Sequence, residues 1–268
     1  MLNALLLVSL AHFAPVAAAP HAAVAAAAQE VDVRASFVEL HAKNDEVGCE
    51  KLFRAHPGDV LGTIDADLEG SLATWEKSPE KPDEAAIAAQ HARALWGAKI
   101  ASRVSSNPIF LDYTSAFVGW TPEQKKNFRG GQAAHGRSRR SLKAKDYAAA
   151  AAAARECIEL AAPLGDWWGH AMGLAALGQT LAAEGKHNEA LAPLAEAALI
   201  YRQLQFSRDE LGLQRTLGAS LVALGAKQRA LAALERALVL SEQLGDAKGV
   251  EALKAQLDPL RAELGGKR

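Results

Sequence analysis

The sequence of 268 residues lacks the patterns that mark β-structure. No segment alternates apolar and polar residues over the length of a strand, and neither Asn-Gly nor Asp-Gly occurs to close a tight hairpin. Aromatic residues make up only 6% of the chain, and alanine supplies much of its 50% hydrophobic content. Because alanine buries little surface but favours helices, we expect an all-α protein stabilised by many close helix contacts.

Motifs typical of enzymes and cofactor-binding proteins are also missing. The sequence has no Gly-x-Ser-x-Gly elbow, no Gly-x-x-x-x-Gly-Lys phosphate loop, no Gly-x-Gly-x-x-Gly fingerprint and no His-Glu-x-x-His zinc helix. Cys49 and Cys157 are its two cysteines, and the absence of a Cys-x-x-Cys pair excludes zinc ribbons and thioredoxin-type redox sites. We therefore predict no catalytic residue, cofactor or metal; an enzyme with an unrecognised site in residues 29–120 is the minor alternative.

Charged residues are absent from residues 1–28, which begin with a short apolar stretch and end in three alanines. This composition resembles a secretory signal peptide cleaved after Ala28, although no Lys or Arg precedes the apolar stretch. We predict an exported protein, periplasmic or extracellular; the alternatives are the Ala-rich leader of a cytoplasmic protein and a membrane anchor. No later segment has the roughly 18 unbroken apolar residues that a transmembrane helix needs. The net charge of −1 gives no general reason to expect binding to nucleic acid or membrane.

Helical periodicity begins after this leader. Residues 57–78 and 83–104 place large apolar side chains at steps of three and four, which is typical of amphipathic helices. Thr121-Pro122-Glu123-Gln124 is a strong helix start, because threonine caps the helix, proline takes the first position and Gln124 completes a capping box. We assign residues 29–120 to an N-terminal helical region, whose sequence does not show whether it is a set of degenerate repeats or a separate cap.

A 40-residue repeat occupies the second half of the chain. Gly165-Asp166 recurs as Gly245-Asp246, and Leu177-Gly178 recurs as Leu217-Gly218. A fixed period of this length is the signature of a solenoid built from helix pairs. The predicted repeat domain is 121–268. Its three units are 127–166, 167–206 and 207–246, followed by a capping helix over about 247–264.

Small residues recur at matched levels of each predicted helix pair. In the middle unit, Gly178 on the first helix lies opposite Ala190 on the second, and both lack the bulk that would keep two antiparallel helices apart. Gly185 supplies the left-handed backbone that ends a helix. Cys157 stands where the later units carry alanine, so we expect it to be a small buried core residue.

This pattern resembles the tetratricopeptide repeat (TPR) family in its 40-residue form, over about residues 127–264. The resemblance implies a right-handed α-solenoid of antiparallel helix pairs whose concave face binds a peptide or protein segment. The family's starting tryptophan and closing proline are absent. The residues that carry the resemblance are Leu177, Gly178, Leu181, Gly185, His187, Ala190, Leu194 and Ala197, and again Leu217, Gly218, Leu221, Gly225, Lys227, Ala230, Leu234 and Ala237.

The first unit departs from the family pattern. Arg137-Ser138 replaces the expected Leu-Gly, and Lys145 replaces the turn glycine, whereas Tyr147 and Ala150 fit. We therefore expect its first helix to be amphipathic in a different way, or to have its apolar stripe shifted.

A basic stretch over residues 125–145 is the candidate functional feature, since it holds eight Lys or Arg and no acidic residue. His135, Arg139 and Lys143 are four residues apart and therefore share one helix face. The resemblance places that face in the groove, with Gln179 and Arg215 at the equivalent face of the next two units. These five residues are the predicted peptide-binding set, and their charge favours an acidic partner. A solvated basic helix face is the simpler alternative, and a patch for anionic lipid or nucleic acid is another, although no interleaved aromatic residues support base stacking.

Residues 65–76 offer a second candidate, because acidic residues and Gly70 follow the spacing of a calcium-binding loop. Leu68, however, belongs to the apolar stripe that runs from Val60 to Trp75. That stripe needs a continuous helix, so we favour plain helix here and predict no calcium site.

Two functional hypotheses follow. The first is a non-enzymatic scaffold that binds a protein or peptide segment on its concave face. The alternative is a regulatory or sensor module of the TPR type, which would act in trans because the chain carries no recognisable effector domain.

Overall fold

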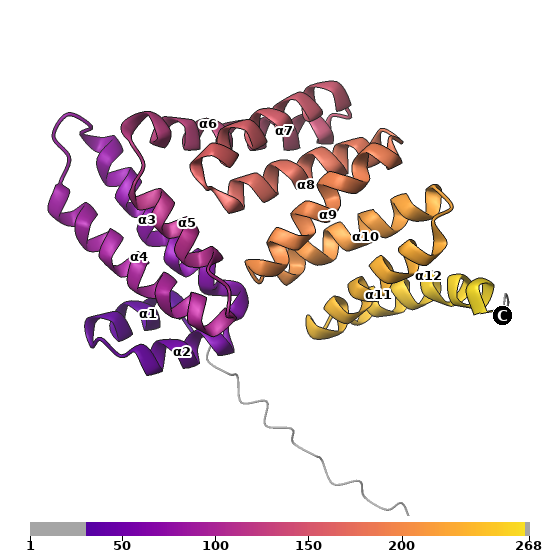
Figure 1. The fold of residues 1–268 in the computed structure, drawn as a ribbon, viewed down its shortest axis with the longest axis horizontal. Helices are drawn as coiled ribbons and strands as arrows, with labels where there is room; N and C mark the ends of the chain where they lie inside the picture. Colours follow the sequence, from indigo (N-terminus) through magenta and orange to yellow (C-terminus); the bar gives the residue numbers. More distant parts are fainter. Residues whose placement is uncertain (1–30, 266–268) are drawn as a thin grey trace, which may run out of the picture. The chain divides into compact units, whose positions relative to one another are not determined.

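The computed structural model describes residues 31–265, and this part of the chain is all-α (Figure 1). The predicted signal peptide, residues 1–28, lies outside the described residues. From α6 to α12 each helix packs against the next one in the chain, and in the N-terminal region α1 packs on α2, α3 on α4 and α4 on α5. The helices are α1 Val33–Ala42, α2 Glu46–Ala55, α3 Val60–Lys77, α4 Glu84–Ser105, α5 Ile109–Val118, α6 Pro122–Lys143, α7 Tyr147–Ala161, α8 Trp167–Ala183, α9 His187–Gln203, α10 Ser207–Ala223, α11 Lys227–Gln243 and α12 Ala247–Gly265, with 3-10 turns at Pro57–Asp59 and Ala162–Leu164.

The predicted repeat is present, and its helices begin at a fixed interval from α7 onward. A residue in the left-handed conformation stands at the turn before each of these helices, at Lys145, Gly165, Gly185, Gln205, Gly225 and Gly245. The regular spacing of these turns explains the 40-residue period, since each unit contains two helices and two such turns. Lys145 and Gln205 adopt this conformation at φ 61° and 63° without being glycine, which is why they do not stand out in the sequence.

Close contact between the two helices of a pair depends on glycine. A Cβ added to Gly178 on α8 would lie 2.6 Å from Cγ and 3.1 Å from the backbone nitrogen of Leu194 on α9. Gly218 meets Leu234 in the same way in the next pair, at 2.6 Å from Cδ2. Each leucine is fully buried in the space that its glycine leaves open. The predicted role of Gly178 is therefore confirmed.

The first unit keeps this register, so the predicted alternative of a shifted stripe is wrong. Ser138 on α6 takes the place of Gly178, is fully buried, and donates its hydroxyl to the backbone carbonyl of Ala150 at 2.9 Å. The hydrogen bond satisfies the hydroxyl and keeps α6 against α7. The buried stripe is narrower on α6 than on α8. On α6 it consists of Phe128, Gly131, Ala134 and Ser138.

Helices α1 to α5 form the N-terminal region, and a buried carboxylate ties three of them together. Asp67 on α3 accepts from Arg34 on α1 at 2.7 and 2.6 Å and from Arg93 on α4. Two guanidinium groups around one carboxylate offset the cost of burying its charge. They also hold the pKa of Asp67 below its ordinary value, even though burial alone would raise it.

The N-terminal region and the repeats share one hydrophobic core. The buried cluster that begins at Phe37 in α1 continues without a break into α8, α9 and α10. Trp120 marks the junction: its ring packs on Phe117 and Phe128, and its indole Nε1 donates to the carbonyl of Leu164 at 2.9 Å.

A second buried carboxylate, in the repeat region, is also bound by two arginines. Glu210 on α10 is 1% exposed and accepts from Arg202 on α9 at 2.9 Å and from Arg236 on α11 at 2.8 Å. Glu210 and Arg236 are 26 residues apart, the same separation as Asp67 and Arg93. In both places the buried carboxylate is bound by an arginine of the next helix in the chain.

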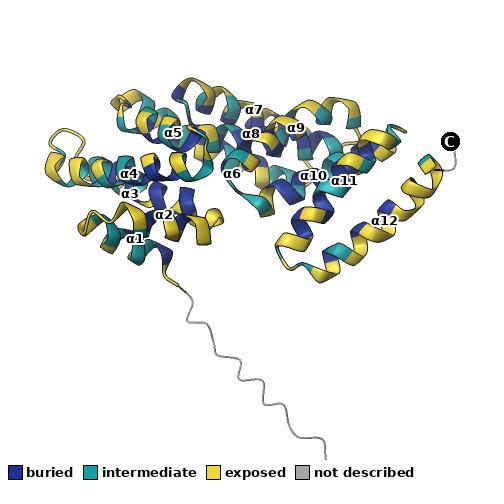
Figure 2. Cartoon of the chain, turned by 60° about the horizontal axis from the view of Figure 1, so that its bottom comes forward, coloured by how far each residue is buried: buried dark blue, intermediate teal, exposed yellow. Residues whose placement is uncertain are grey.

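Buried and exposed residues alternate along the helices, because each helix turns one side to its neighbours and another to solvent (Figure 2). Cys157 is buried, as predicted, and both cysteines are free thiols. The last helix, α12, buries Gly249, Leu253, Leu257 and Leu260 and exposes most of its other residues, which is the expected pattern of a capping helix. No helix among residues 31–265 is both long enough and apolar enough to cross a bilayer.

Gly178→Ala should lower the free energy of unfolding by about 1–3 kcal/mol, because the added methyl group forces α8 away from Leu194. Gly212→Ala on α10 is the matched control, since a Cβ there meets no atom within 4 Å. The control should leave stability unchanged or raise it by up to about 1 kcal/mol through helix propensity. Urea unfolding followed by circular dichroism measures both; equal effects would show that Gly178 is not a close-contact position.

Candidate binding face

The candidate face belongs to the first helix of each repeat pair: α6, α8, α10 and α12. Helix α8 contacts both α6 and α10 directly, so the first helices of successive pairs lie side by side. Residues 40 apart occupy equal positions on them. We define the first-helix face as the outward stripe through residues 135, 139, 142 and 143 of α6 and the residues 40, 80 and 120 positions later.

On α6, Arg139 and Lys143 are exposed and form no ion pair with any described residue. His135, one turn earlier, is half-buried. Burial and the neighbouring charge of Arg139 lower its pKa, while the backbone of Met172 on α8 acts in the opposite direction. His135 therefore lies against α8, and the two cations beyond it point to solvent.

Gln179 on α8 is half-buried and lies one repeat after Arg139. The structure thus places four of the five predicted residues, His135, Arg139, Lys143 and Gln179, on neighbouring helices with no described ion pair among them. Their role in binding remains a prediction.

Arg215 on α10 differs from the other four. Its guanidinium donates to Ser241 Oγ at 3.0 Å and to Asp246 Oδ2 at 3.1 Å, at the turn that leads into α12. The hydrogen bond from the backbone of Gly249 lowers the pKa of Asp246, and the bond from Arg215 lowers it further. Because Arg215 holds this turn, reversing its charge would disturb the fold as well as any ligand.

The other basic residues of 125–145 either contact neighbouring helices or are exposed to solvent. Arg129 binds Glu76 at 2.7 Å and Glu69 at 2.7 Å, both on α3. Lys125 lies over the ring of Trp75 at 5.0 Å. Three of the basic residues, Lys125, Arg129 and Arg137, thus hold neighbouring helices, a use that the sequence alone did not reveal.

The calcium-loop alternative is excluded by the course of the chain. Residues 65–76 lie within the continuous helix α3, as the apolar stripe predicts. Asp67 is occupied by two arginines, and Asp65 accepts a hydrogen bond from Tyr113 Oη at 2.6 Å. Among residues 31–265 no three His, Cys, Asp or Glu side chains gather in a way that could hold a metal ion.

Two buried carboxyl groups near the junction of α3, α5 and α8 were not anticipated. Burial raises the pKa of Asp65 to about 6, although the hydrogen bond from Tyr113 opposes the shift. Burial also raises the pKa of Asp166, the residue that caps α8, to about 7. The charge of Asp65 adds to the shift of Asp166, after the larger effect of burial.

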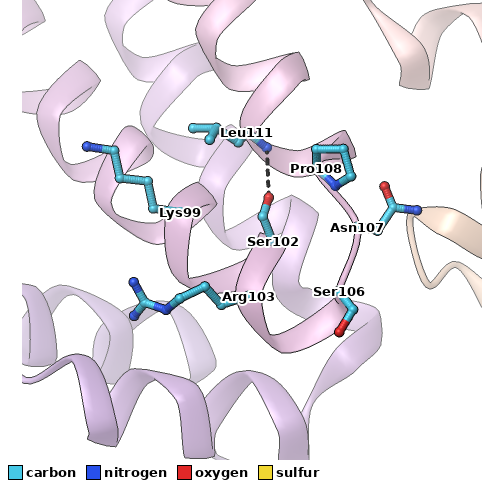
Figure 3. A pocket seen from close by; sticks show the side chains of 7 residues that line it. All are labelled: Lys99, Ser102, Arg103, Ser106, Asn107, Pro108 and Leu111. Atoms are coloured by element: carbon cyan, nitrogen blue, oxygen red, sulfur yellow. Dashed lines mark hydrogen bonds between the residues drawn. The ribbon is translucent and has the colours of Figure 1, made fainter.

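An open hollow of about 490 Å³ lies where α4 meets α5 (Figure 3). Its polar groups are mostly occupied: Ser102 Oγ accepts from the backbone nitrogen of Leu111 at 3.2 Å, and Arg103 pairs with Glu46 and Glu50. Asn107 caps the start of α5 through the nitrogen of Ile109. The hollow is therefore the space at the corner between α4 and α5, and we do not assign it as a ligand-binding site.

No protein-family model and no curated protein matches the chain. Among solved structures, the crystal structure of BtubC (BKLC) from P. vanneervenii aligns over 89% of this chain and 94% of its own, with 13% sequence identity and a TM-score of 0.33. Similarity at that level carries no functional inference. The fold is an all-α, TPR-like solenoid. That description rests on the consecutive helix pairs and their 40-residue register.

The free energy of unfolding of the wild type should fall between pH 4 and pH 8 as Asp65 ionises. Asp65→Asn should make this fall smaller by about 3 kcal/mol. The pKa of Asp65 is higher in the folded chain, so its stabilising contribution is complete below about pH 4 and disappears as pH rises through 6. Asparagine accepts the same bond from Tyr113 but does not ionise. Tyr113→Phe should move the transition to higher pH, because it removes the donor that opposes the shift. Melting temperatures over pH 4–8 measure both effects, and identical profiles for Asp65→Asn and the wild type would contradict this assignment.

Proposed function

We propose that the chain is a non-enzymatic interaction scaffold that binds a protein segment on its first-helix face. The supporting observation is the open stripe on these helices. At the positions of residues 139, 142 and 143, helices α6, α8 and α10 all keep exposed or half-buried residues, whereas Ala175, which matches His135, is buried. Repeated, evenly spaced and accessible positions are what a solenoid offers to an extended ligand.

The second helices present a rival surface. Leu199 on α9 and Val239 on α11 occupy equal positions and are 52% and 42% exposed. Charged residues such as Glu196, Arg202 and Glu242 stand close to them on the same helices, and α7 has Glu159 at the matching position. The apolar character of this outer surface therefore does not continue into the first unit, whereas the first-helix face is open in all three units.

The proposal includes both functional hypotheses drawn from the sequence. A scaffold outside the cytoplasm and a regulatory module acting in trans would each use the first-helix face, and they differ in the partner and in the compartment. The export signal proposed for residues 1–28 favours the first.

Site-specific photo-crosslinking tests which face is used. A benzoylphenylalanine in place of Gln179 or Ala219 should crosslink to a protein from an extract of the source organism. The same residue in place of Leu199 or Val239 should not, although all four positions are accessible. Crosslinks from the Leu199 and Val239 positions alone would move the binding surface to the second helices and contradict the proposal.

A further inference from the structure

Charge is distributed unequally over the first helices. Helix α6 carries seven Lys or Arg and one Glu, whereas α8 carries no Asp, Glu, Lys or Arg at all. Helix α10 has no charged residue after Arg215, and Arg215 is already paired with Asp246. At the stripe positions defined above, unpaired positive charge is therefore found on α6, at Arg139 and Lys143. The exposed Arg208 of α10 and Lys254 of α12 lie outside these positions.

A row of apolar residues crosses the same face. Leu142 on α6, Ala182 on α8, Val222 on α10 and Ala262 on α12 are 40 residues apart and occupy equal positions. Val222 is 47% exposed, and the other three are half-buried or exposed. A half-exposed valine in line with other accessible apolar residues leaves a surface that a ligand could cover.

The row is narrow and shallow because most of its neighbours are small. Ala183 and Ala223 follow the row on α8 and α10, and Ala219 lies one turn earlier. Arg139 and Lys143 flank the row only where it reaches α6. Along the face, the surface therefore changes from cationic at α6 to uncharged and apolar at α8 and α10.

We propose that the occupant is an extended protein segment with acidic residues at one end and small uncharged residues along the rest. The acidic end lies at Arg139 and Lys143, and the uncharged part follows Ala182 and Val222. This inference rests on the proposed function and adds the chemistry and direction of the ligand. Packed helices have axes about 8–10 Å apart, so the row from α6 to α10 spans roughly 20 Å, the length of about six extended residues.

The same distribution disfavours a nucleic acid. A nucleic acid carries a phosphate at every nucleotide and gains affinity from each cation that it meets. Helix α8 offers no such cation, and at the stripe positions α10 offers Arg215 alone, which is paired. A ligand with charge at one end matches this face, whereas a ligand with uniform charge does not.

Selection from a library of random dodecapeptides displayed on phage tests the inference, with the full chain as the immobilised protein. Selected peptides should be enriched severalfold in Asp and Glu at one end and in small uncharged residues, such as Ala, Val and Ser, over the next six positions. Arg139→Glu with Lys143→Glu should bind these peptides about tenfold more weakly and select Lys and Arg instead. Raising the salt from about 0.05 to 0.5 M should weaken the wild type more than this variant.

Two further variants make the test specific. Lys126→Glu with Arg155→Glu is the matched control, because it makes the same charge change at exposed positions on another side of α6 and on α7. It should select the same peptides as the wild type. Val222→Asp should keep the acidic preference and lose the preference for small apolar residues. Circular dichroism melting curves confirm that all variants are folded, as expected for changes at exposed positions.

The outcomes separate the inference from the proposed function. Enriched peptides that lack an acidic end, or that keep it after Arg139 and Lys143 are reversed, would overturn the inference and leave the scaffold in place. Enriched peptides whose binding is unaffected by every first-helix variant would overturn both. A folded wild type that enriches no peptide would also count against both.

Discussion

The architecture depends on the close approach of two helices where one of them has no side chain. Leu194 and Leu234 fill the spaces beside Gly178 and Gly218, and no larger residue fits at those glycines without separating the helices. In a protein with few aromatic residues, such contacts supply much of the buried surface. The first pair reaches the same result with Ser138, whose hydroxyl bonds to a backbone carbonyl on α7.

This contact fixes which residues remain accessible. One side of α6, α8 and α10 packs against the second helix of its pair, and the flanks pack against neighbouring pairs. One outward stripe therefore stays accessible on each first helix. The 40-residue register then aligns the stripes, so Arg139, Gln179 and Ala219 stand at equal positions. The change from charge to small apolar residues across that alignment is the property of the face that a ligand would detect.

Much of the fold could be predicted from the sequence, because the period, the apolar stripes and the turn glycines are local signals. The helix starts at 167 and 187 follow from them. The site was harder to predict. Whether a basic residue faces a ligand or a partner helix depends on contacts between distant segments: Arg129 reaches α3, and Arg215 reaches the turn before α12. The raised pKa of Asp65 and Asp166 likewise arises from burial at a junction that no motif announces.

The most direct test of the close-contact claim is a double-mutant cycle in free energy of unfolding. Gly178→Ala is combined first with Leu194→Ala and then with Leu234→Ala, which belongs to the next pair. We expect a favourable coupling of about 1 kcal/mol or more with Leu194→Ala, because the new methyl group occupies the space that the leucine vacates, and additivity with Leu234→Ala. Additivity in both cycles would contradict the account, since Gly178 would then not be the partner of Leu194.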